Sequence, residues 1–121
     1  MHAIANVRTR YYQLVKRLGE PDFVREGSYL NPTEKDLEYC YDSKVSVMWG
    51  MDYEGKKEVE EKYKKWGFAV NDWKEDETPK GLYMWTIRGE NEQAMYKFER
   101  MTGLTAIPLF WRREDVKEEV E

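Results

Sequence analysis

The chain begins with apolar residues that recur at steps of three and four: Ile4, Val7, Tyr11, Leu14, Val15 and Leu18. This spacing places them on one face of an α-helix. Gly19 can adopt the left-handed conformation that ends helices, and Pro21 prevents a helix from continuing. The pattern therefore predicts a helix from Ile4 to Leu18 that covers a sheet.

The next segment, residues 20–36, is loop-like, although Asn31 as cap, Pro32 and Glu34 are suited to starting a short helical turn. Apolar and polar residues alternate from Leu37 to Tyr41 and, after a polar turn at 42–44, again from Val45 to Tyr53. Two alternating runs around a short turn predict a β-hairpin. Because both signals meet in residues 31–42, the sequence leaves helix and strand open there.

The second half of the chain alternates between the two periods. Helical spacing and Glu–Lys pairs predict a helix over 56–66. A second helix is expected from Asn91 to Gly103. Alternating positions predict strands over 68–73, 82–88 and 104–111. Pro108 places the last strand at a sheet edge, because proline cannot donate a ladder hydrogen bond.

These elements predict one α+β domain over residues 1–111, followed by a charged tail at 112–121. We expect an antiparallel or mixed sheet of about four or five strands packed by about three helices. From Val45 onward the order is βαββαβ, which with the N-terminal helix gives a ferredoxin-like arrangement. The alternative is an antiparallel sheet centred on the 37–53 hairpin and strand 82–88, with 54–73 as an insertion.

Composition narrows the class of function. The 121 residues include one Cys and one His, which excludes an internal disulfide and the usual zinc sites, so no cofactor or metal is expected. The net charge of −4 disfavours nucleic-acid binding. No apolar run is long enough to span a membrane, and the N-terminal residues lack the apolar core of a signal peptide. We therefore expect a cytoplasmic protein.

Catalytic groups are sparse. Cys40 lies within an alternating segment and His2 lies at the terminus, so we do not expect them to form a nucleophile–base pair. No glycine-rich phosphate loop is present. The sequence assigns no catalytic residue and favours a non-enzyme.

Aromatic residues are unusually frequent, at 15% of the chain, and this is the feature of the composition that bears most on function. If helices cover the side of the sheet that carries Val45, Val47 and Trp49, the other side presents a candidate binding face. Its members are Met48, Trp73, Leu82, Met84, Arg88 and Phe110, near Cys40 and Thr86. A large exposed apolar face usually marks an interface. Three alternatives remain: another helix covers this face, it forms a homodimer, or it binds a distinct partner or ligand.

Several short motifs occur in a fixed order: Leu18-Gly19-Glu20-Pro21, the segment Val47 to Tyr53, Trp85-Thr86-Ile87-Arg88-Gly89, and a helix near Asn91 with Ala94 inside. This series resembles small uncharacterised α+β proteins encoded by bacteriophages. The resemblance covers residues 11–104, with an insertion at 56–73. It implies no activity, but it implies an accessory viral protein that acts on host machinery in the host cytoplasm.

Three functions follow from these observations. The first is a non-catalytic protein-binding module, with a protein partner or a second copy on the apolar face. The second is a small-ligand binder or enzyme with a pocket at the sheet edge, using groups such as Asp52, Tyr53 and Arg88. The third is a nucleic-acid binder that resembles RNA-recognition modules, which share the βαββαβ order. The sequence favours the first.

Overall fold

The computed structural model describes residues 2–39, 44–50 and 66–110, which form an α+β fold with a six-stranded sheet and three helices. The strands are β1 (His2–Arg10), β2 (Phe23–Val24), β3 (Val47–Trp49), β4 (Ala69–Asn71), β5 (Leu82–Gly89) and β6 (Ile107–Pro108). The helices are α1 (Tyr11–Leu18), α2 (Glu34–Tyr39) and α4 (Glu92–Thr102).

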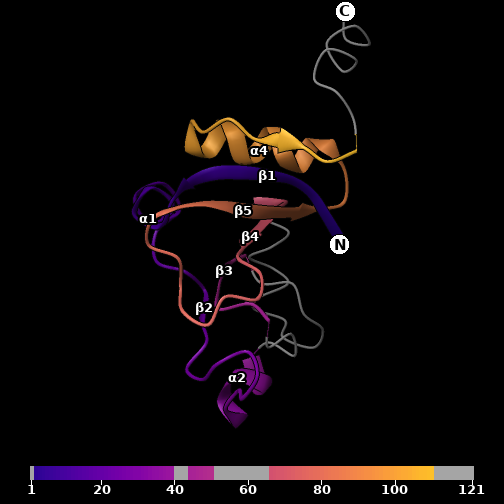
Figure 1. Ribbon diagram of the computed structural model, residues 1–121. Coiled ribbons are helices and arrows are strands. Elements are labelled where there is room, and N and C mark those ends of the chain that lie inside the picture. Colours follow the sequence, from indigo (N-terminus) through magenta and orange to yellow (C-terminus); the bar gives the residue numbers. More distant parts are fainter. Residues whose placement is uncertain (1, 40–43, 51–65, 111–121) are drawn as a thin grey trace, which may run out of the picture.

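The sheet has the strand order β2-β3-β4-β5-β1-β6, and every neighbouring pair is antiparallel. Its longest pairing joins β1 to β5, from His2 opposite Gly89 to Arg10 opposite Leu82, with one irregularity between Ala3 and Ala5. Figure 1 shows α2 beyond β2, at the opposite end of the molecule from α4. The sheet therefore has a long central pair and short outer strands.

Helices α1 and α4 pack on one face of this sheet. Their buried side chains include Leu14, Met95 and Phe98, which join a core with Val7 and Trp85 of the central strands. The indole rings of Trp49 and Trp85 meet edge to face, with centroids 5.8 Å apart, an arrangement that aromatic rings favour. Burial of these large side chains is the main force holding helices to sheet.

The predicted N-terminal helix is wrong over its first half, because His2–Arg10 forms β1 and only Tyr11–Leu18 is helical. Ile4 and Val7 satisfy a three-residue step, but β-branched residues also favour strands. As a strand, His2–Arg10 also provides hydrogen-bond partners for backbone groups along the whole length of β5, which a helix at this position would not do. Gly19 ends α1 as expected, with a φ of 87°.

The segment 31–42, left open between helix and strand, is helical over Glu34–Tyr39, which forms α2, and residues 40–43 lie outside the described part. The expected hairpin is therefore not formed: β3 pairs instead with β2 and β4. The helix start is displaced as well. Thr33, rather than Asn31, is the cap, because its hydroxyl accepts the Asp36 N–H at 3.1 Å. The short strand β2 lies within a segment expected to be loop.

The predictions for the second half are better. Strands β4 and β5 lie within the predicted 68–73 and 82–88 segments apart from one residue, and α4 begins after Asn91 and ends before Gly103. The last strand is shorter than predicted, and Pro108 lies in the edge strand β6 as expected. The predicted helix 56–66 (apart from Trp66), the end of the 45–53 strand and the tail 112–121 lie outside the described residues.

The sheet has six strands rather than four or five. The βαββαβ order was expected to begin at Val45, but the first strand of the sheet is β1. The consecutive strands β6-β1-β5-β4, with helices after β1 and β5, are compatible with a ferredoxin-like order, to which β3 and β2 are added at one edge. Within the described residues, every helix is too short or too polar to cross a membrane.

Candidate binding face

The side chains of strand β5 alternate between the buried core on one side of the sheet and an exposed surface on the other. Trp85 and Ile87 are fully buried beneath the helices, whereas Leu82 and Met84 point to the other side and remain 51% and 42% exposed. Successive side chains of a strand face opposite sides of the sheet, so the same backbone that builds the core also displays these two apolar groups. The exposed side of β5 is the first component of the site.

Strand β1 adds two arginines to this side. Its register places Arg8 opposite Met84 and Arg10 opposite Leu82, and both arginines are exposed. Directly opposed side chains have Cβ atoms about 4.5–5.5 Å apart, so each guanidinium stem runs beside an apolar neighbour. The side also includes Asn6, opposite both Thr86 and Ile107. We call this surface the open face: Asn6, Arg8, Arg10, Leu82, Met84, Thr86 and Ile107.

The charge of the open face differs from that of the chain. Strands β1, β5 and β6 contain no aspartate or glutamate, although the chain has 24 acidic residues and a net charge of −4. Arginine stays protonated at any physiological pH. Arg8 and Arg10 therefore make a local positive surface with apolar groups between them, within a protein that is acidic on average.

The predicted face is only partly brought together. Leu82, Met84 and Arg88 share one side of β5, and Arg88 is half-buried. Met48 lies on the same side of the sheet, opposite Asn71 and Phe23, but is only 2% exposed. Because a buried methionine cannot contact a partner, including Met48 in the binding face was wrong.

Two predicted aromatic residues lie outside the strands. Trp73 follows β4 and is exposed, and its backbone N–H donates to the Tyr83 hydroxyl at 3.2 Å. Phe110 follows β6 and is the most exposed predicted residue, with its ring 6.4 Å from that of His2. Trp73 and Phe110 therefore flank the central β1–β5 pair rather than line it. Cys40 lies outside the described residues.

Arg8 and Arg10 are not among the predicted site residues, because the sequence predicts one helix over residues 4–18 where the structure has strand β1. On a helix, Arg8 and Arg10 fall on different parts of the polar surface; on a strand, residues two apart share a face. A signal was present: Asn6, Arg8 and Arg10 alternate with Val7 and Thr9. That alternation predicts the observed strand.

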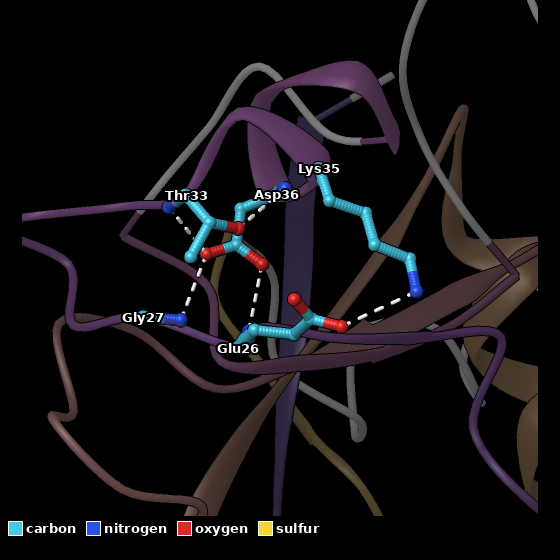
Figure 2. Close-up of polar contacts among 5 residues, drawn as sticks. All are labelled: Glu26, Gly27, Thr33, Lys35 and Asp36. Atoms are coloured by element: carbon cyan, nitrogen blue, oxygen red, sulfur yellow. Dashed lines mark hydrogen bonds and ion pairs between the residues drawn. The ribbon is translucent and has the colours of Figure 1, made fainter.

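Away from the open face, a polar network holds the short outer strands. The Asp36 carboxylate accepts the backbone N–H groups of Glu26 at 2.7 Å, Gly27 at 2.9 Å and Thr33 at 2.9 Å, as Figure 2 shows. With the Thr33 hydroxyl, this is a reciprocal capping arrangement at the start of α2. Burial would raise the pKa of Asp36, but these hydrogen bonds lower that pKa below its ordinary value.

A second buried carboxylate joins β3 to the end of β4. Oδ1 of Asp72 accepts the N–H groups of Ser46 and Val47 at 2.8 and 3.1 Å, and Oδ2 accepts the Ser46 hydroxyl at 2.6 Å. Here burial dominates and raises the pKa of Asp72, although these donors oppose the shift. Both carboxylates are occupied by backbone donors, which indicates that they stabilise the fold rather than act on a substrate.

The described residues offer little for chemistry. No group of three or more His, Cys, Asp or Glu among them is placed to hold a metal ion. A groove of about 280 Å³ lies between β2 and α2, but its lining includes Asp36, already used by backbone donors, and the ion pair of Lys35 with Glu26 at 3.2 Å. Asp52 and Tyr53, proposed for a pocket at the sheet edge, lie outside the described part.

The chain matches no protein-family model, and no curated protein or solved structure is significantly similar to it.

Proposed function

We propose that this protein is a non-catalytic binding module that holds a polypeptide partner on its open face. The observation that carries the proposal is the exposure of Leu82 and Met84 on β5, a strand that lies inside the sheet between β4 and β1. The opposite side of the sheet is buried under helices α1 and α4. Side chains of this size gain about 1.5–3 kcal/mol each when fully buried. Covering them is therefore a source of binding energy.

The flanking arginines support the same function. Arginine and methionine are enriched at protein contacts, where their stems pack and their polar ends give specificity. The resemblance to bacteriophage proteins suggests where to look: we propose a host protein as partner, in the host cytoplasm. A self-contained homodimer through the open face is the variant of this function that the test must distinguish.

A matched pair of methionines allows a sharp test. Met84 is 42% exposed on β5 and Met101 is 43% exposed on α4, in the helical layer. Met84→Glu places a charge on the open face, whereas Met101→Glu makes the same change elsewhere. Tagged wild-type protein and both variants would be used for affinity capture from lysate of the native host, with nuclease added.

We expect a nuclease-resistant partner to be captured by wild type and Met101→Glu at similar levels, and by Met84→Glu at a level about tenfold lower. Thermal unfolding of all three proteins controls for folding. Equal capture by Met84→Glu and wild type would refute the proposal, as would loss of the captured material on nuclease treatment.

A further inference from the structure

We infer that the open face is selective for an acidic polypeptide segment with apolar side chains, in which carboxylates pair with Arg8 and Arg10 while apolar groups cover Leu82 and Met84. This inference rests on the proposed function and names its partner class. It follows from the register, which sets each arginine directly opposite one of the two apolar residues.

The register makes apolar contact and charge inseparable. A partner that covers Met84 must also approach Arg8, and one that covers Leu82 must approach Arg10. Removing a guanidinium from water without a counter-charge is costly, and strands β1, β5 and β6 have no carboxylate to provide one. Since these three strands provide no carboxylate, we infer that the partner brings the carboxylates.

The spacing of the arginines limits how the carboxylates are arranged. Residues two apart on a strand lie about 6.5–7 Å apart along it. Alternate residues of an extended segment have the same spacing, and residues three or four apart on a helix lie about 5–6 Å apart. A suitable segment thus carries two acidic residues at one of these spacings, with apolar residues beside them.

A nucleic acid also carries negative charge, but the centre of the open face does not suit one. Single-stranded nucleic acids are held by stacking of bases on aromatic side chains. The open face has aliphatic Leu82, Met84 and Ile107 where such rings would be needed, and Trp73 and Phe110 lie outside its strands. Aliphatic groups beside arginines are complementary to a polypeptide.

The test is a selection of random peptides displayed on yeast, using the full chain as bait. The baits are wild type, Met84→Glu, the charge reversal Arg8→Glu/Arg10→Glu, and a control reversal, Lys16→Glu/Arg17→Glu, on exposed positions of α1. Selected peptides are then synthesised, and their Kd is measured by fluorescence anisotropy at low and high salt. A labelled single strand of thymidines is measured beside them.

We expect wild type and the α1 control to enrich peptides with two Asp or Glu residues beside apolar ones. The Arg8→Glu/Arg10→Glu reversal should bind these peptides with a Kd at least about 100-fold higher, and as a bait it should enrich peptides that carry Lys and Arg. A change of preference, rather than simple loss, cannot be produced by misfolding.

The other outcomes separate the inference from the function. Peptides that depend on Met84 but are neutral or basic would overturn the acidic specificity and leave the binding module intact. Peptides indifferent to Met84→Glu would overturn both. Preferential binding of the thymidine strand, lost on arginine reversal, would show a nucleic-acid site instead. A concentration-dependent dimer abolished by Met84→Glu would make a second copy the occupant and would also refute the inference.

Discussion

The two buried carboxylates permit a comparison in which the same change, Asp to Asn, is expected to destabilise the fold strongly at one position and very little at the other. Asp36→Asn and Asp72→Asn both replace one carboxylate oxygen by an NH2 group at constant size. At Asp36, Oδ1 accepts the Glu26 N–H and Oδ2 accepts those of Gly27 and Thr33. Both oxygens therefore face backbone donors, and either orientation of an asparagine points NH2 at an N–H.

The cost at Asp36 follows from these contacts. At least one backbone N–H loses its acceptor, which costs about 1–3 kcal/mol when the group is buried. The remaining bonds change from charged to neutral acceptors, which weakens each by about 1 kcal/mol. We expect Asp36→Asn to lower the free energy of unfolding by about 3–5 kcal/mol, a large share of the 5–15 kcal/mol typical of a domain.

At Asp72 the donors are divided differently. Both backbone N–H groups, of Ser46 and Val47, donate to Oδ1, whereas Oδ2 accepts the Ser46 hydroxyl. Asparagine can keep its carbonyl at the first position, and the hydroxyl can rotate to accept from NH2. The substitution also removes a buried charge. We expect a change within about 1 kcal/mol at neutral pH, of either sign.

Denaturant unfolding followed by tryptophan fluorescence measures both variants against wild type. Asp72→Ala serves as the control, because it removes every acceptor and should destabilise strongly. Two results would refute these roles of the carboxylate oxygens. One is a free energy of unfolding for Asp36→Asn equal to that of wild type; the other is a loss of stability in Asp72→Asn as large as that in Asp72→Ala.

The pH dependence gives a second readout of opposite sign. Folding lowers the pKa of Asp36. The ionised carboxylate therefore contributes its full stabilisation of the fold at a pH above the ordinary pKa of aspartate, and this stabilisation is lost as the pH falls through the pKa of the folded state. The deficit of Asp36→Asn should therefore shrink in acid. The pKa of Asp72 is raised by folding, so wild type gains stability relative to Asp72→Asn as pH falls through that raised pKa.

Two further predictions concern α4. Gly89→Ala should destabilise the fold by about 1–3 kcal/mol, because the new Cβ would lie 2.3 Å from that of Ala94; Gly81→Ala, which meets no atom within 4 Å, is the control in the same thermal unfolding assay. Asn91→Ala should cost about 1 kcal/mol by removing the cap on the Gln93 N–H, and equal melting of Asn91→Ala and wild type would contradict that role.

The elements that the sequence predicted well are those with a single interpretation. For α4, an asparagine cap, apolar residues at helical spacing and Gly103 in the left-handed conformation all agree, and the structure has each of them. For β5, apolar residues occupy both faces, yet Trp85 and Ile87 alternate with Thr86 clearly enough to place the strand. Local preference and tertiary packing coincide in both elements.

The elements that the sequence predicted wrongly are those whose patterns fit more than one structure, between which only long-range contacts decide. Ile4 and Val7 fit a helical step, and Val7 with Thr9 fits a strand. Pairing with β5, which is distant along the chain, selects the strand. At α2 the expected cap is Asn31, whereas the structure has Thr33 in that role. Asp36 decides for Thr33 because it also accepts N–H groups from residues 26 and 27, which local sequence does not reveal.

The same limit explains why only half of the open face could be foreseen. Leu82 and Met84 belong to an element whose conformation was clear, so their side of the sheet followed from alternation. Arg8 and Arg10 acquire a common direction only because β1 is a strand, and they acquire apolar neighbours only because it pairs with β5 in this register. A shift of one residue would turn both arginines into the core. The charge of the open face is thus a property of register, which a net charge of −4 conceals.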